Sequence, residues 1–230
     1  RPAIRALRQC DFCVPGDPLA AHLNKDVFVE LADAAAAYYK RAGELWEIRP
    51  PRTEWDWDKL LHEARESAHI NPIPEAPKWA NLVKETHRAL DHLLDLWHAR
   101  PINSWCHGDL HPGNLMRRPE GSPWGAPCAV LLDYAESHCG HWVEDAVYVE
   151  RLFWGKPELL DGAKPVSLLA KARRKLGLDT SDDYALYANV RRVLMAAVAP
   201  AFVHREGHPK YLHAALEMLE KNLPIVVKHA

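Results

Sequence analysis

The chain has 230 residues, of which 48% are apolar, and this is enough to bury a sizeable hydrophobic core. Its 29 basic and 31 acidic residues nearly cancel, so the chain lacks the strong positive field of a nucleic-acid-binding protein. No window approaches the roughly 20 consecutive apolar residues of a membrane-spanning helix. We therefore expect a soluble protein without a nucleic-acid or membrane partner.

Cysteine is sparse and odd in number, which argues against a disulfide framework and predicts a reducing, cytoplasmic location. Cys10 and Cys13 form a CxxC pair, but zinc usually needs four ligands and the sequence contains no second CxxC. We interpret the pair as reduced thiols, with a metal half-site as the alternative.

Residues 1–24 are rich in Pro, Arg and small residues and show no sustained period, which is typical of a connector. The first residue is Arg rather than Met, and no signal-peptide pattern follows it. This beginning favours a fragment that continues from a segment upstream.

The first half of the chain then shows helical periodicity. Apolar residues predict an amphipathic helix over 27–45, ended by the Arg-Pro-Pro at 49–51. Residues 53–56 match a capping box before a short helix. Three prolines predict a loop over 69–77, and the longest apolar stripe predicts one core helix over 79–97.

The period changes between residues 105 and 133, where Gly, Pro and Asn cluster around short apolar runs. The run from Cys128 to Leu132 is continuously apolar and ends before Asp133, which is typical of a buried strand that carries a carboxylate at its tip. We predict that Leu115-Met116 pairs with this strand through a hairpin loop over 119–127.

Helical periodicity returns at residue 143 and continues to the end of the chain. It predicts helices over 143–153 and 166–176, and a third helix over 186–197 that follows a capping box at 180–183. The last predicted helix covers 211–219 and stops near Pro224. The expected fold is therefore mainly α with a small β-hairpin, an α+β fold.

A loop with an unusual density of polar groups reads His107-Gly-Asp109-Leu-His111-Pro-Gly-Asn114. Its Gly and Pro residues prevent a helix, which argues against a zinc pair formed by the two histidines. The spacing His-x-Asp-x-x-x-x-Asn is that of the kinase catalytic loop, in which the Asp accepts the substrate hydroxyl and the Asn binds magnesium. Asp133 lies where a second magnesium-binding carboxylate is needed.

The segment from His107 to Met116, with Leu131-Leu-Asp-Tyr134 downstream, resembles the aminoglycoside phosphotransferase and choline kinase family, which has a protein-kinase-like fold. The resemblance implies transfer of a phosphate from ATP or GTP to a hydroxyl of a small molecule. By position it implies these roles: Asp109 as the catalytic base, His107 as a buried organiser of the loop, Asn114 and Asp133 as Mg²⁺ ligands, and Asp145 and His111 as supporting residues.

A complete family member also has an N-terminal lobe with a phosphate-covering loop and a strand-borne Lys. No such Lys precedes the first long helix, so the N-terminal nucleotide lobe is expected to be absent from this chain. We expect residues 25–230 to form the helical catalytic lobe, with the catalytic loop at 105–117 and the metal-binding strand and loop at 128–145. The fragment alone is expected to have negligible kinase activity.

The acceptor is less defined by the sequence. Trp55, Asp56 and Asp58 place aromatic faces beside carboxylates, a combination that holds cationic amines. The alternative is that these residues serve a helix core and its cap. A second alternative is a catalytically silent kinase-like module that binds a ligand or a partner. The sequence leaves the acceptor and the oligomeric state open.

Overall fold

The computed structural model describes residues 17–50, 55–123 and 125–228. The predicted connector is therefore described only from residue 17 onward. Cys10 and Cys13 and the first half of the capping box at 53–56 lie outside the described residues.

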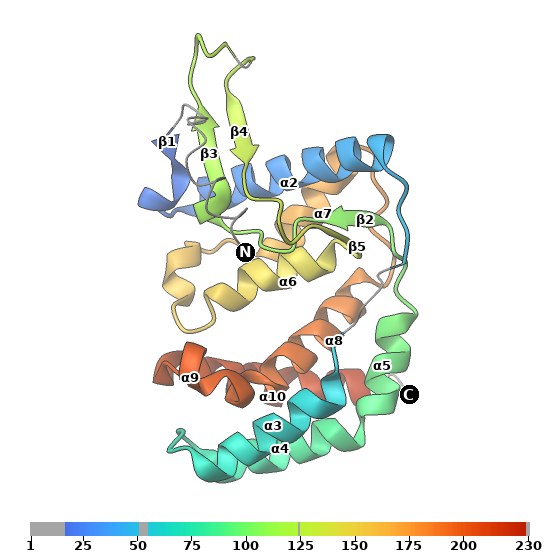
Figure 1. Cartoon of the computed structure of the whole chain (residues 1–230), viewed down its shortest axis with the longest axis vertical. Coiled ribbons are helices and arrows are strands. Elements are labelled where there is room, and N and C mark those ends of the chain that lie inside the picture. Colours follow the sequence, from blue (N-terminus) through green and yellow to red (C-terminus); the bar gives the residue numbers. More distant parts are fainter. Residues whose placement is uncertain (1–16, 51–54, 124, 229–230) are drawn as a thin grey trace, which may run out of the picture.

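Helices form most of the molecule and lie in two layers (Figure 1). One layer, beside the strands, holds α2, α6 and α7, and the other holds α3, α4, α8 and α10. The helix bounds are α2 Lys25–Leu45, α3 Trp57–Ile70, α4 Ala76–Arg88, α5 Leu90–His98, α6 Val143–Leu152, α7 Pro165–Lys175, α8 Tyr184–Ala197, α9 Val203–Glu206 and α10 Pro209–Val227. Short 3-10 turns cover Leu19–Ala21, Pro112–Asn114, Pro157–Leu160 and Ala199–Phe202.

Two small antiparallel sheets complete the fold. The first has the order β1-β3-β4, with β1 at Asp17–Pro18, β3 at Leu115–Arg118 and β4 at Cys128–Leu131. Leu115 pairs with Leu131, so the predicted hairpin is confirmed. The second sheet pairs β2 (Ser104–Cys106) with β5 (His138–Gly140). The α+β fold class is thus confirmed.

The hydrophobic core runs through both helical layers, and α2 and α6 both pack against α7. Asn24 caps α2 by accepting the N–H of Val27. Ala35 and Ala36 are fully buried on α2, which packs on α7. Tyr39, on the same helix, is buried as well, and its hydroxyl reaches Asp145 on α6. The packing of α2 therefore places the Tyr39 hydroxyl in the interior, beside the start of α6.

The predicted helix over 79–97 is wrong in one respect, because α4 and α5 are separate helices that break at Ala89. The hydroxyl of Thr86 donates to the carbonyl of Leu82, a bond within the helix that favours bending. The loop predicted over 69–77 is shorter, because α4 already begins at Ala76. Pro77 lies in its first turn, where the missing N–H is not needed.

Both predicted capping boxes are also corrected. Asp56 is itself the N-cap of α3 and accepts the N–H of Lys59 at 3.0 Å, so it does not occupy the third helical position. Asp183 is the N-cap of α8 but makes no side-chain cap bond. Ser181 instead adopts a left-handed φ of 61° and donates its N–H to Asp179, which removes this segment from helical geometry.

The predicted end of the last helix near Pro224 is wrong, because α10 continues to Val227. Leu223 and Val226 on either side of this proline are buried. Their packing outweighs the loss of one helical hydrogen bond.

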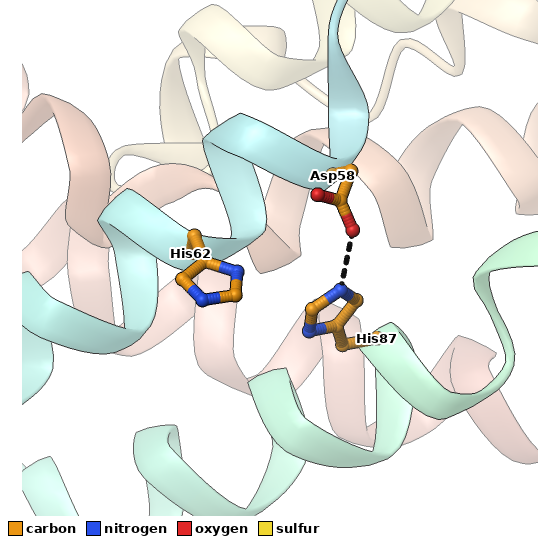
Figure 2. A group of neighbouring side chains, drawn as sticks. All are labelled: Asp58, His62 and His87. Carbon is orange, nitrogen blue, oxygen red and sulfur yellow. Dashed lines mark hydrogen bonds and ion pairs between the residues drawn. The ribbon is translucent and has the colours of Figure 1, made fainter.

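Helices α3 and α4 also share a polar contact on their outer face (Figure 2). Asp58 of α3 lies 2.7 Å from Nε2 of His87 on α4, and His62 lies beside them.

Within the described part of the chain, no single helix is long and apolar enough to cross a membrane. Helix α8 and the segment Ala199–Arg205 reach that length and hydropathy only as a pair bent by 49°.

Candidate active site

The loop at 107–114 leaves β2 through a turn that only glycine fits. Gly108 has a φ of 84°, in the left-handed region, and a Cβ at this position would clash with the carbonyl oxygen of Glu136. The close approach holds the loop against the segment that precedes β5.

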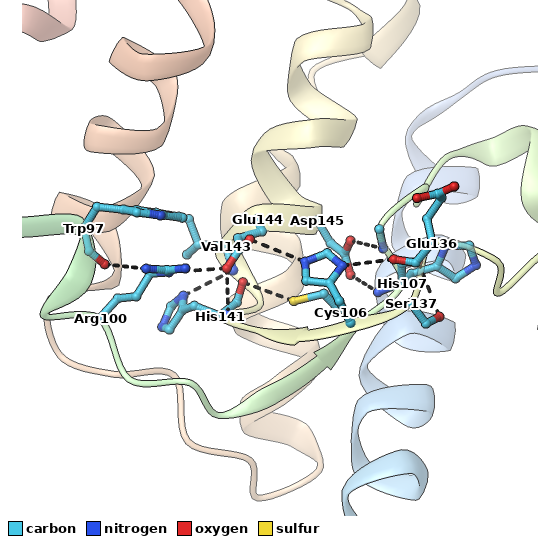
Figure 3. Close-up of polar contacts among 12 residues, drawn as sticks. Trp97, Arg100, Cys106, His107, Glu136, Ser137, His141, Val143, Glu144 and Asp145 are labelled. Carbon is cyan, nitrogen blue, oxygen red and sulfur yellow. Dashed lines mark hydrogen bonds and ion pairs between the residues drawn. The ribbon is translucent and has the colours of Figure 1, made fainter. Parts of the chain in front are cut away.

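Asp145, in the first turn of α6, fixes the beginning of this loop (Figure 3). Its buried carboxylate accepts the backbone N–H of His107 at 2.6 Å and that of Gly108 at 2.9 Å. The hydroxyl of Tyr39 donates to it at 2.8 Å. Burial raises the pKa of Asp145, whereas these three hydrogen bonds favour its charged form. The carboxylate therefore joins α2, α6 and the loop.

His107 connects the loop to the end of β4. Its ring is fully buried, with Nδ1 accepting the N–H of Asp109 at 3.3 Å and Nε2 lying 2.9 Å from the carbonyl oxygen of Leu132. A carbonyl oxygen only accepts, so Nε2 carries the proton and donates it to Leu132. This ring links Asp109 to the residue that precedes Asp133.

Asp109 is half-buried and surrounded by donors. The hydroxyl of Tyr148 donates to Oδ1 at 2.6 Å, Nδ2 of Asn114 donates to Oδ2 at 3.1 Å, and Nε2 of His111 lies 3.4 Å from Oδ2. Burial raises the pKa of Asp109, but the Tyr148 hydrogen bond, the His111 charge and the Asn114 hydrogen bond outweigh it. The pKa of Asp109 thus lies below its ordinary value, which keeps the carboxylate ionised at neutral pH.

His111 is oriented by its own turn. Its Nδ1 accepts the N–H of Gly113 at 2.9 Å, so Nε2 faces the carboxylate of Asp109. The two predicted supporting residues therefore contact different parts of the loop: Asp145 its beginning, and His111 the carboxylate itself.

Asn114 and Asp133 lie on adjacent backbone segments. Nδ2 of Asn114 donates to the carbonyl and the carboxylate of Asp109, which leaves its Oδ1 directed away from them. The N–H of Leu132 donates to the carbonyl of Asn114 at 2.9 Å, which brings Asp133 to the same edge. Amide and carboxylate oxygens are the ligands that Mg²⁺ prefers.

Asp133 itself has the features of a ligand rather than of a structural residue. Its side chain is exposed and makes no hydrogen bond or ion pair with the described residues. Its φ of 58° is unusual for a residue other than glycine, and such strain is frequent at ligand-binding positions. The two residues therefore fit a divalent cation.

A cavity of about 870 Å³ opens beside Gly108 and Tyr148, and neither Asn114 nor Asp133 lines it. Its wall includes the indoles of several tryptophans, namely Trp46, Trp55, Trp57, Trp97 and Trp105.

The three predicted substrate contacts are thus not brought together. Asp56 is used as the cap of α3, and Asp58 faces α4, so only Trp55 lines the cavity. Ligand atoms of Asp58, His62 and His87 all lie within 4.8 Å of one another, a spacing compatible with a metal ion (Figure 2). This cluster lies outside the cavity wall.

Glu144 organises the polar wall between β5 and α6 (Figure 3). Its carboxylate accepts the N–H of His141 at 3.0 Å and Nε of Arg100 at 3.3 Å, and lies 3.5 Å from Nε2 of His138. Burial raises the pKa of Glu144, but the His138 hydrogen bond and nearby arginines lower it to about 2. The same hydrogen bond is the main cause that raises the pKa of His138 to about 9.

Cys106 adjoins His138 and Glu144, and the three residues have the spacing of metal ligands. Burial raises the pKa of the Cys106 thiol well above its ordinary value, and the thiol donates to the carbonyl of His141. In this arrangement the cationic side chains of Arg100 and His138 contact Glu144.

Sequence reasoning missed Tyr148, Tyr39, Glu144 and Arg191 as members of the site and its wall. Tyr148 follows Asp145 by one helical turn, so helical spacing placed the two on one face of α6 and was a usable signal. Tyr39 and Arg191 come from α2 and α8, and no local pattern marks them.

Comparison with known proteins agrees with this geometry. The model of the phosphotransferase enzyme family (APH) matches residues 12–163. A choline kinase from Cryptosporidium parvum Iowa II superposes with a TM-score of 0.53 at 13% identity, over 94% of this chain and 70% of that one. Choline kinase LicA from Streptococcus pneumoniae gives 0.51 at 16% identity, over 89% and 66%.

At these identities the two kinases show the fold alone, and the chain spans about two thirds of their length. No curated protein matches the sequence. The family model, however, covers more than half of the chain and includes both loops of the site. On this evidence the chain belongs to the phosphotransferase enzyme family.

Proposed function

We propose that the protein transfers the terminal phosphate of ATP or GTP to a hydroxyl of a small molecule, with Mg²⁺ as the metal. The observation that carries the proposal is the joined geometry of Asp109, Asn114 and Asp133. Asn114 contacts Asp109 directly, and the His107 ring ties the Asp109 backbone to the strand end before Asp133. In this proposal residues 25–230 form the catalytic lobe.

Asp109 acts as the base that orients and accepts from the hydroxyl. Phosphoryl transfer passes through a loose transition state, so alignment of the hydroxyl matters more than strong proton abstraction. The low pKa of Asp109 suits this role, because the carboxylate stays ionised while Tyr148 and Asn114 hold its orientation. Asp109 is not itself part of the cavity wall, but Tyr148, which donates to it, and the adjacent Gly108 are, so an acceptor in the cavity would approach Asp109 beside Tyr148.

Asn114, through Oδ1, and Asp133, through its carboxylate, are the groups proposed to hold Mg²⁺. The bound ion supplies charge neutralisation on the phosphate oxygens. His107, Asp145 and His111 keep the loop in place and contact neither metal nor nucleotide in this proposal.

Asp109→Asn in the whole protein tests the base. With ATP or GTP and a panel of hydroxyl acceptors, we expect turnover to fall by about 10²- to 10⁴-fold, the range of general-base contributions. Binding of Mg²⁺-nucleotide, measured by calorimetry, should persist because Asn114 and Asp133 are intact. Asp95→Asn, at an exposed position on α5, is the matched control and should retain turnover.

Retained turnover in Asp109→Asn would remove the base assignment. If the wild type shows neither turnover nor Mg²⁺-dependent nucleotide binding, the phosphotransferase function itself is contradicted.

A further inference from the structure

Arg191, on α8, is held in the cavity wall by three tryptophans. Its Cζ lies 5.5 Å from the ring centroid of Trp55, 5.4 Å from that of Trp57 and 5.3 Å from that of Trp97. Trp55 and Trp57 stack on each other with centroids 5.2 Å apart. The rings restrict the guanidinium and shield it from bulk water, and burial lowers its pKa. The guanidinium remains charged nevertheless, because arginine does not deprotonate in proteins.

Among the residues that the structure describes, none accepts a hydrogen bond from this guanidinium. A guanidinium offers five N–H donors, yet Arg191 makes no hydrogen bond and no ion pair with any residue that the structure describes. Arg191 is half-buried and lies in the wall of the cavity. A cation with unused donors at such a wall indicates a position where a ligand supplies the acceptor.

The charged groups around Arg191 are mostly cationic. Besides Arg191, the inner wall carries Arg100, Arg151 and His138, and His138 is a cation because its pKa is raised to about 9. Two carboxylates face these four cations. Asp145 is already used by the loop N–H groups, and Glu144 contacts Arg100 and His138 while also attracting Arg191 electrostatically, without a hydrogen bond to it.

The remaining charged residues of the wall reduce this excess without reversing it. Arg49 and Glu47 pair with each other there, and Glu136 adds one negative charge. Positive charge therefore remains in excess around the space that Arg191 faces.

We infer that Arg191 binds a carboxylate of the acceptor, so that the substrate is a hydroxyl compound with an acidic group. This inference rests on the proposed function. A planar guanidinium matches a carboxylate through two parallel hydrogen bonds. The sequence suggested that tryptophan rings here bind a cationic amine, but Arg191 of the protein itself already lies over the rings of Trp55 and Trp57.

The cavity is large enough for both ends of such a substrate. Its volume of about 870 Å³ is within the range of small-molecule sites, and its wall includes Arg191 as well as Gly108 and Tyr148. The acid therefore sits on Arg191 while the hydroxyl meets Asp109.

Tryptophan fluorescence of the whole protein, without nucleotide, tests the inference, because three indoles surround the guanidinium. The probes are glycerate, 4-hydroxybutyrate, L-serine and pantoate, each titrated against its own carboxamide. At least one carboxylate should bind about tenfold or more tightly than its carboxamide, as expected for a charge-assisted bidentate contact.

Arg191→Met should abolish this preference and Arg191→Lys should retain only part of it, because Lys keeps the charge but loses the fork. Arg174→Met is the control, since that guanidinium also lies over a ring, Tyr184, but outside the cavity wall. Near-UV circular dichroism of the stacked indoles verifies that the Arg191 variants are folded.

The inference is overturned if no carboxylate binds better than its carboxamide, or if Arg191→Lys and Arg191→Met both keep the preference. Turnover of uncharged or cationic alcohols alone would support the proposed function and overturn the inference. Selective carboxylate binding without any turnover would support the role of Arg191 in binding a carboxylate and contradict the proposed function.

Discussion

Gly108 separates two residues of the candidate site, His107 and Asp109, and takes a conformation that glycine alone adopts easily. We expect Gly108→Ala to destabilise the protein by more than about 2 kcal/mol, since left-handed strain costs about 1 kcal/mol and the clash with the Glu136 carbonyl adds to it. Chemical denaturation measures the change.

Gly162→Ala is the matched control for this prediction. Gly162 has a similar φ of 72°, but a Cβ there meets nothing within 4 Å, so only the strain is added. Equal losses in the two variants would show that the contact with Glu136 is not tight.

Single residues also show how far the sequence reaches. The motif predicted roles for Asp109, Asn114 and Asp133 because phosphoryl transfer requires these residue types at this spacing, and the fold brings the three residues to one edge. It did not identify Tyr148 or Arg191. A tyrosine or an arginine has many structural uses, and only the packing of α6 and α8 gives these two a place at the cavity.

At the level of elements, α10 contains a proline, Pro224, in its last turns, and we expect this proline to lower the stability of the helix. Pro224 is exposed and cannot donate to the preceding turn. Because Leu223 and Val226 already hold this turn against the core, we expect Pro224→Ala to stabilise the protein by about 1 kcal/mol or more, less than the full interior penalty since the helix ends nearby.

Thermal or denaturant unfolding tests this, with Lys221→Ala on the same exposed face as a control of small effect. A loss of stability in Pro224→Ala would mean that the proline fits the bend of the helix rather than straining it.

Helical elements were predictable where an apolar face repeats over several turns, as in α2, α6, α7 and α8. The shortest strands were not, because β1 and β5 have two and three residues and carry no readable period. The break at Ala89 and the cap of α3 involve individual side-chain hydrogen bonds, and the start of α8 follows the left-handed turn at Ser181, none of which periodicity reveals.

The stability of the whole molecule should depend on pH through His141. This side chain is fully buried, and burial, with the charge of Arg173, lowers its pKa to about 4. Between pH 6.5 and 4 the unfolded chain binds a proton that the folded chain does not, so stability falls as the pH falls. Two to three pKa units correspond to about 3 kcal/mol.

His138 has the opposite sign, because its pKa is raised and its contribution is lost as the pH rises toward 9. We expect His141→Asn to be less stable at neutral pH but to have a flatter stability profile between pH 6.5 and 4, measured by urea unfolding. His69→Asn, at an exposed position, should keep the wild-type slope. An unchanged slope in His141→Asn would show that other groups cause the loss of stability between pH 6.5 and 4.

The ring of His107 and the carboxylate of Asp145 hold the loop, the end of β4 and the start of α6 as one unit. The tryptophans and Arg191 belong to α3, α5, α8 and the segment before α3, and no described residue of these elements bonds to His107 or Asp145. Helix α8 is joined to α6 farther along, through Arg192 and Glu150. In the proposed function, substitutions around Arg191 would therefore change which acceptor is bound and leave the hydrogen bonds of His107 and Asp145 intact. Acceptor specificity could then evolve separately from the reacting groups.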